Sequence, residues 1–137
     1  MPWLARQMKW LMCVSGALTC TMLYAAIAPQ AALRSNFGTT LEGPIAEIIV
    51  RNWGALIGLV GLLLIYGAFV APARRLALTV AVLSKVTFIA LVLAFGRELL
   101  AYQVGTAVMI DAVWVVVFGA YLIGAKHRGP RVPPRPA

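Results

Sequence analysis

Four long apolar stretches separated by short polar segments dominate the hydrophobic pattern of this 137-residue chain. Each holds about 20 residues or more, enough for a helix to cross a hydrocarbon layer of ~30 Å. We predict helices at about residues 8–28, 44–71, 73–96 and 103–125. Pro29 ends the first, Gly43 and Pro44 begin the second, and a tight turn at 71–75 precedes the third. The predicted fold class is all-α: a polytopic membrane protein with a four-transmembrane-helix bundle, its transmembrane domain covering residues 1–125.

Composition agrees with this fold class, because 62% of the residues are hydrophobic and only 12% are charged. A soluble domain carries about 25% charged residues. One face of the predicted bundle has cations and no acid: Arg6, Lys9, Arg74, Arg75, Lys126, Arg128, Arg131 and Arg135. The other face balances Arg34, Arg51 and Arg97 against Glu42, Glu47 and Glu98. The positive-inside rule then predicts that both termini are cytoplasmic, in a bacterial inner membrane.

Two segments lie outside the predicted spans. Residues 29–43 form the longest external connection, which we expect to lie flat on the outer surface. Residues 126–137 form a basic, Pro-rich cytoplasmic tail that is expected to be extended and to attract anionic lipids, with docking of a partner as the alternative. The dispersed cations read as membrane anchors, so nucleic acid is not an expected partner. We expect residues 1–28 to be a retained helix rather than a cleaved signal peptide, because their apolar run is long and Pro29 follows it.

The second helix carries an ion pair and a glycine stripe. At 28 residues it would be ~42 Å long, so its first two turns should stand in the outer interface. Glu47 and Arg51 have the i, i+4 spacing of a helical ion pair, with the acid first. Gly54, Gly58 and Gly61 fall on one stripe that lets another backbone approach closely. The stripe predicts either helix packing within the bundle or an oligomer interface.

Lys85 and Asp111 are the two charged residues inside the apolar stretches. Each charge costs about 2.5–3.5 kcal/mol at bilayer depth and therefore needs a partner or a function. Counted at about 1.5 Å per residue from the cytoplasmic anchors, the depths of Lys85 and Asp111 differ by roughly 6–7 Å. Helical side chains also lean toward the helix N-terminus, which moves these two side chains in opposite directions. We therefore expect no direct salt bridge, unless water or a tilt of the helices closes the gap. The separate partners expected at matching depth are Thr19, Cys20 or Trp114 for the lysine, and Tyr24 for the aspartate.

Lys85, Asp111, Tyr24, Trp114 and Thr19 thus make a candidate intramembrane polar site. The alternatives for Lys85 are snorkelling to the headgroups, a structural hydrogen bond between helices, or a role in transport or ligand binding. For Asp111 they are a protonated structural residue, a role in proton relay or substrate binding, or a carboxylate that reaches the outer interface.

Other chemistry has little support in the sequence. The single histidine, His127, lies in the tail, and no cluster of residues has metal-ligand spacing, so no metal or cofactor is expected. Cys13 and Cys20 would be about 10 Å apart on one helix, too far for a disulfide. Without a catalytic constellation, the chain is not expected to be an enzyme.

The entry to the second helix, with Pro44, Glu47, Arg51 and Trp53-Gly54, together with four short helices and both termini inside, resembles the DoxX-like group of small bacterial membrane proteins. The likeness covers about residues 8–125. It implies a four-helix membrane fold and, for some members, work as accessory subunits of membrane redox systems. The resemblance does not assign a function to any residue of this chain.

We expect a small, non-catalytic accessory or assembly subunit of a membrane complex, acting as a homo-oligomer or with other chains. The alternative is a small proton-coupled transporter or channel subunit that uses Lys85 and Asp111 as an internal polar site. A wetted cavity that reaches Lys85 from one side would favour this alternative. A dry, closed bundle with both charges bonded to neighbouring helices would rule it out.

Overall fold

The computed structural model describes residues 2–127, and these form an all-helical fold. Four helical spans are long and apolar enough to cross a membrane, which confirms the predicted fold class at that level: Pro2–Ile27, Pro44–Phe69, Ala71–Phe95 and Gln103–Lys126. The predicted tail lies outside the described residues from 128 onward. The elements are α1 (Pro2–Cys20), η1 (Thr21–Leu23), α2 (Tyr24–Ile27), α3 (Pro29–Phe37), α4 (Pro44–Phe69), α5 (Ala71–Phe95), η2 (Arg97–Ala101) and α6 (Gln103–Lys126).

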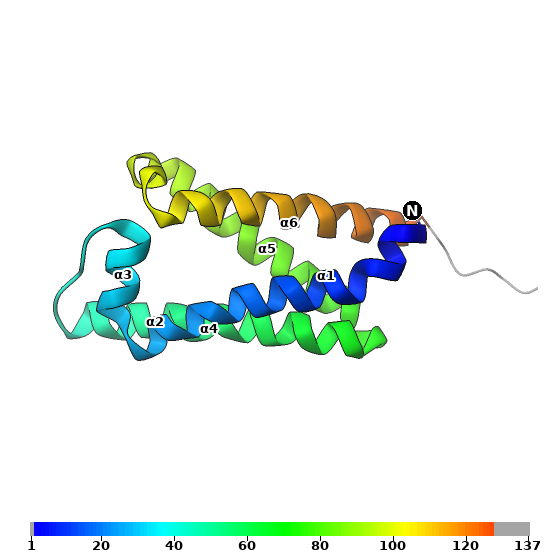
Figure 1. The fold of residues 1–137 in the computed structure, drawn as a ribbon, viewed down its shortest axis with the longest axis horizontal. Helices are drawn as coiled ribbons and strands as arrows, with labels where there is room; N and C mark the ends of the chain where they lie inside the picture. The colour runs from blue at the N-terminus through cyan, green and yellow to red at the C-terminus, as the bar shows by residue number, and fades with distance from the viewer. Residues whose placement is uncertain (1, 128–137) are drawn as a thin grey trace, which may run out of the picture.

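The four spans form two layers in Figure 1. The continuous α1, η1 and α2 lie along α4, α6 lies on the other side, and α5 crosses between the two layers. The start of α1, the α4–α5 turn and the end of α6 gather at one end of the bundle, which we call the terminal end. The helix α3 and the turn η2 lie at the opposite end, the α3 end.

Two boundaries differ from those predicted. The first helix begins at Pro2 rather than near residue 8, because a basic first turn can stand at the membrane surface without interrupting the helix. The turn between α4 and α5 is at Val70, and residues 71–75 already belong to α5, whose first turn accommodates Pro72. Arg74 stabilises this turn: its guanidinium donates to the carbonyls of Gly67 (3.2 Å) and Ala68 (2.9 Å) at the end of α4.

The segment 29–43 contains α3, a helix that runs across the direction of the spans at the α3 end of the bundle (Figure 1). Pro29 begins α3 and Gly38 ends it, with a φ of 72° that suits glycine. Ala32, Leu33 and Asn36 are buried on its inner side. A helix in this segment was not predicted from the sequence, and its position on the outer membrane surface stays a prediction.

The glycine stripe packs inside this chain. A Cβ added at Gly61 would lie 2.7 Å from the carbonyl oxygen of Gly16, and one at Gly54 would lie 2.7 Å from Ala25 Cβ. Gly58 receives the side chain of Leu23. The stripe therefore brings the first span into backbone contact with α4, which is the helix-packing alternative of the prediction.

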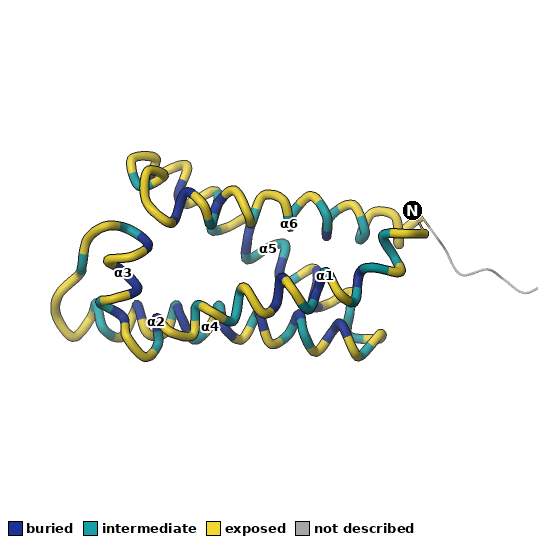
Figure 2. Tube along the Cα trace, in the orientation of Figure 1, coloured by how far each residue is buried: buried dark blue, intermediate teal, exposed yellow. Residues whose placement is uncertain are grey.

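Buried side chains gather on the inner faces of the helices, and α6 is the least covered span (Figure 2). At the terminal end, one cluster joins all four spans: Met8, Met12, Leu64, Ala68, Ala77, Leu78, Ala81 and Phe118. A smaller cluster at the α3 end contains Val92, Val104 and Val108, with Phe37 of α3 packed against it. The first cluster ends at Ala81 and Phe118, one turn from Lys85 and Trp114, where a cavity begins.

Candidate functional site

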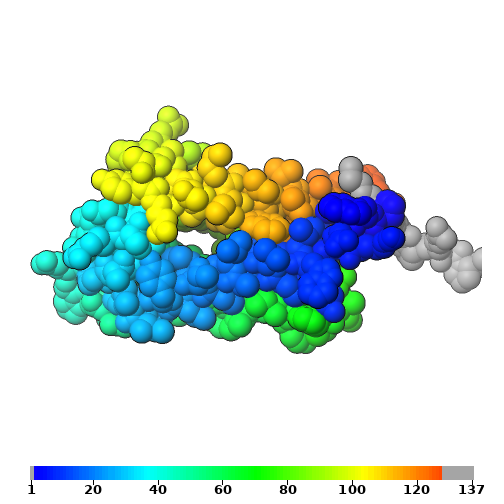
Figure 3. All heavy atoms as spheres, viewed as in Figure 1, coloured from blue at the N-terminus to red at the C-terminus, as the bar shows by residue number. Residues whose placement is uncertain are grey.

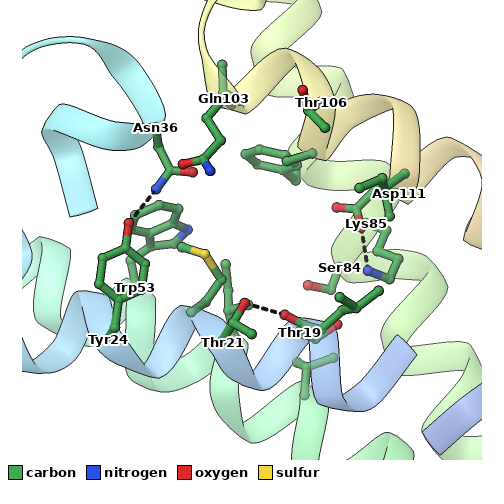
Figure 4. Close-up of a pocket in the computed structure, with 18 of the residues that line it drawn as sticks. Thr19, Thr21, Tyr24, Asn36, Trp53, Ser84, Lys85, Gln103, Thr106 and Asp111 are labelled. Atoms are coloured by element: carbon green, nitrogen blue, oxygen red, sulfur yellow. Dashed lines mark hydrogen bonds and ion pairs between the residues drawn. The ribbon is translucent and has the colours of Figure 1, made fainter. Parts of the chain in front are cut away.

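A cavity of about 720 Å³ lies between the first span, α3, α4, α5 and α6. Its walls are mostly apolar and include the rings of Phe37, Trp53, Phe88 and Trp114. Its polar side chains gather in two places (Figure 4). Lys85, Ser84 and Asp111 lie at one side, and Tyr24, Asn36 and Gln103 lie toward the α3 end. This combination of apolar walls and a few convergent polar groups is typical of small-molecule sites.

Lys85 and Asp111 form a direct ion pair across α5 and α6, with Lys85 Nζ 2.5 Å from Asp111 Oδ1. The expectation that they would not touch was wrong. It assumed that the anchors of the two helices are level and gave weight to side-chain lean. The flexible four-carbon stem of lysine can depart from that lean, and leaving two charges unpaired at bilayer depth costs far more than one altered rotamer.

The pair is unevenly covered. The side chain of Lys85 is 8% exposed and that of Asp111 is 20% exposed. In Figure 4 the carboxylate of Asp111 points into the cavity, and Ser84 lies beside the lysine. Within residues 2–127, the second carboxylate oxygen of Asp111 has no hydrogen-bond partner. We call this side of the cavity, formed by Lys85, Ser84 and Asp111, its floor. The floor offers a hydrogen-bond acceptor next to an ammonium group.

The partners expected for the two charges were wrong, although the residues do line the same cavity, apart from Cys20. The hydroxyl of Tyr24 lies 2.5 Å from Ser35 Oγ and accepts a hydrogen bond from Asn36 Nδ2 at 3.2 Å. Thr19 donates to the carbonyl of Ser15 in its own helix at 2.7 Å. Both hydroxyls thus bond away from the charged pair, because nearer partners are available to them.

The other two expected partners of Lys85 also point elsewhere. Trp114 stacks on Phe118 with ring centroids 5.3 Å apart. The thiol of Cys20 lies 3.7 Å from the carbonyl oxygen of Gly58 in the α1–α4 contact. Cys13 and Cys20 are both free, as expected from their spacing.

Ser15 is a cavity residue that the sequence reasoning missed. It is fully buried, lines the cavity, and its hydroxyl has no hydrogen-bond partner among the described residues. Its hydroxyl oxygen is enclosed by the protein, so it does not contact an occupant of the cavity. Its spacing of four residues from Thr19 on the first span was the available signal.

The polar face of α6 was also readable from the sequence. Gln103, Asp111 and Trp114 all line the cavity and recur at spacings close to whole helical turns. Asn36 and Ser35 gave no such signal, because their place depends on how α3 folds back over the bundle.

The pair Glu47–Arg51 lies outside the cavity and is confirmed, with Arg51 Nε 3.0 Å from Glu47 Oε2. Arg51 also donates to the carbonyl of Ala26 at 2.6 Å, and Gln30 Nε2 donates to Glu47 at 3.3 Å. These contacts hold the start of α4 against the junction of α2 and α3. They position α3, at the α3 end of the cavity, and do not contact Lys85 or Asp111.

Within residues 2–127, no group of three potential metal ligands gathers in space. Comparison with protein-family models, curated proteins and solved structures finds no match to this chain. The resemblance to the DoxX-like group therefore stays a prediction, and the function has to be argued from the cavity itself.

Proposed function

We propose that this protein is a small proton-coupled transporter, or the subunit of one, that binds a small molecule in the cavity beside Lys85 and Asp111. The observation that carries the proposal is that both intramembrane charges meet at the floor of a cavity of about 720 Å³. Sites for drug-sized molecules have volumes of about 300–1,000 Å³. A proton on Asp111 would break the ion pair and free the ammonium of Lys85, which links ligand binding to protonation.

The exposure of the pair supports a functional role over a purely structural one. Removing two charges from water costs free energy that their attraction often only balances, so a buried ion pair is weak evidence for a stabilising role. Here the side chain of Asp111 keeps 20% exposure and lines the cavity. Intramembrane ionisable groups that face a cavity typically mark a substrate or proton path.

The structure gives the alternative of an accessory subunit less support than the sequence did. Its main sequence argument was the stripe Gly54, Gly58 and Gly61 as a contact for another chain, and in the structure that stripe is occupied by the first span. The described residues do not indicate a particular partner chain, so we propose the transporter first.

The polar nature of the cavity can be tested by cysteine reactivity. In a Cys13→Ala/Cys20→Ala background, Ser84→Cys places a thiol in the cavity lining, and Leu83→Cys places one on the adjacent lipid-facing position, which is 62% exposed. Only the thiolate reacts with N-ethylmaleimide, and thiolates form poorly in hydrocarbon. We expect Ser84→Cys to react about tenfold faster or more. Equal rates would show a dry cavity and contradict the proposal.

The role of the pair can be tested in cells that lack the gene. The double variant Lys85→Met/Asp111→Leu replaces the ion pair with apolar side chains and should reach normal membrane levels. We expect it to reproduce the growth phenotype of the deletion under a panel of stresses. The matched control, Glu47→Gln/Arg51→Met, removes the ion pair outside the cavity and should complement. Full complementation by the Lys85/Asp111 double variant would refute the proposal.

A further inference from the structure

The cavity opens sideways, between the first span and α6. Four of its lining residues are exposed along the two facing edges: Leu18 and Thr21 on α1 and η1, and Thr106 and Ile110 on α6. Figure 3 shows the opening as a hollow between these two spans. Since both edges belong to membrane-spanning helices, this opening faces the lipid rather than the aqueous phase.

Contacts at both ends hold the two edges apart. Toward the terminal end, Met12 of α1 and Phe118 of α6 belong to the same fully buried cluster. At the α3 end, Phe37 packs against Val104 and Val108 of α6. The ring of Tyr102 covers Gly38, so closely that a Cβ there would overlap it. The side opening is therefore framed by packed side chains.

Side chains of α3 bridge the α3 end of the cavity. The hydroxyl of Tyr24 bonds to Ser35 and Asn36 and so ties α3 to the first span. The same helix contacts α6 through Phe37. Tyr24, Ser35 and Gln103 line the cavity at this end and are exposed, so water has access there. A largely apolar ligand partitions into the bilayer and therefore meets the side opening instead.

The floor of the cavity favours an uncharged head group. Lys85 and Asp111 neutralise each other, so a charged ligand would bring an unbalanced charge into a low-dielectric site. Asp111 Oδ2 is available to accept a hydrogen bond, and a hydroxyl group can donate it. Phe88 and Trp114 lie one turn from Lys85 and Asp111 and line the same cavity, so a ring in the ligand would meet aromatic surface.

We propose that the cavity takes an uncharged amphiphile from the membrane through the side opening, and that the hydroxyl group of its ring-bearing head donates to Asp111. The apolar body lies along the aromatic walls toward the opening. This inference rests on the proposed function, because it names the ligand class and the entry route of the same site.

The test uses the two tryptophans that line the cavity, Trp53 and Trp114. The variant Trp3→Phe/Trp10→Phe removes the other two in the chain. The protein in lipid nanodiscs is titrated with a ring-brominated 4-alkylphenol, which quenches nearby tryptophans, and with its methyl ether, which lacks the donor. We expect saturable quenching by the phenol. The ether should bind about 10- to 100-fold more weakly, the difference for one hydrogen bond to a charged group.

Two further variants separate the head-group contact from the route. In Lys85→Met/Asp111→Leu the preference for the phenol over the ether should disappear. Thr106→Phe narrows the opening and should slow association with the phenol about fivefold or more. Met109→Phe, at a position of α6 that is 72% exposed and faces away from the cavity, should leave the rate unchanged.

The outcomes distinguish the two proposals. Equal affinity for phenol and ether, or equal association rates in Thr106→Phe and Met109→Phe, would overturn the present inference and leave the proposed function standing. The same holds if neither probe quenches saturably while Ser84→Cys still reacts faster than Leu83→Cys. If those two cysteines also react at equal rates, both proposals fail.

Discussion

Removing one partner of the Lys85–Asp111 pair should destabilise the bundle more than removing both. An unpaired charge at bilayer depth costs about 2.5–3.5 kcal/mol. Lys85 is the more buried partner, at 8% side-chain exposure against 20% for Asp111. We therefore expect Asp111→Leu, which strands the lysine, to cost about 3 kcal/mol, and Lys85→Met, which leaves a carboxylate facing the cavity, to cost about 2 kcal/mol.

The double variant Lys85→Met/Asp111→Leu should lie within about 1 kcal/mol of the unsubstituted protein, because apolar replacement of a buried pair is often neutral or stabilising. The measurement is the free energy of unfolding in mixed micelles titrated with SDS, followed by circular dichroism. The matched control is the exposed pair Glu47–Arg51, whose side chains are 37% and 48% exposed. Its single variants should each cost about 0.5 kcal/mol.

The result that would refute this reasoning is additivity. If the losses in Asp111→Leu and Lys85→Met simply add in the double variant, the two charges do not interact in the membrane. The pair could then not form the floor of a binding site. A double variant that is stable yet inactive in cells would instead separate the role of the pair in function from its role in folding.

Three further predictions test the architecture. Gly61→Ala places a Cβ 2.7 Å from the Gly16 carbonyl oxygen and should cost about 1–3 kcal/mol of unfolding free energy in the same titration, whereas Gly119→Ala meets open space and should not destabilise. Arg74→Met removes two hydrogen bonds to the end of α4 and should cost about 1–2 kcal/mol, whereas Arg75→Met at the exposed neighbouring position should cost less than about 0.5 kcal/mol. Reporter fusions at both termini should be active on the cytoplasmic side, and a reporter in 38–43 on the outer side; the reverse pattern would contradict the charge-based topology.

Features set by local geometry could be predicted from the sequence. The four spans follow from runs of apolar residues whose length matches the bilayer. The Glu47–Arg51 pair follows from an i, i+4 spacing that any helix imposes. The close approach at Gly61 follows from the absence of a side chain, although the sequence did not show which helix would approach.

Features that depend on how helices lie against each other were missed. The Lys85–Asp111 contact joins residues 26 positions apart on two helices, and counting residues from each anchor does not show whether the anchors are level. The helix α3 was not predicted because residues 29–43 were interpreted as an external connection, although Pro29 and Gly38 mark a helix start and end. The partners of Tyr24 were hidden for the same reason, since both come from α3.

The lining of the cavity argues for the kind of molecule that occupies it in the membrane. A cavity of about 720 Å³ that opens between two membrane-spanning helices is filled by water or by a component of the membrane. Water would satisfy the free carboxylate oxygen of Asp111, yet it would wet the rings of Phe88 and Trp114. A lipid chain would cover the rings and leave the polar floor without partners. An amphiphile with a hydrogen-bonding head meets both demands, so the physical requirements of filling this space select the ligand class that the ion pair and the side opening favour.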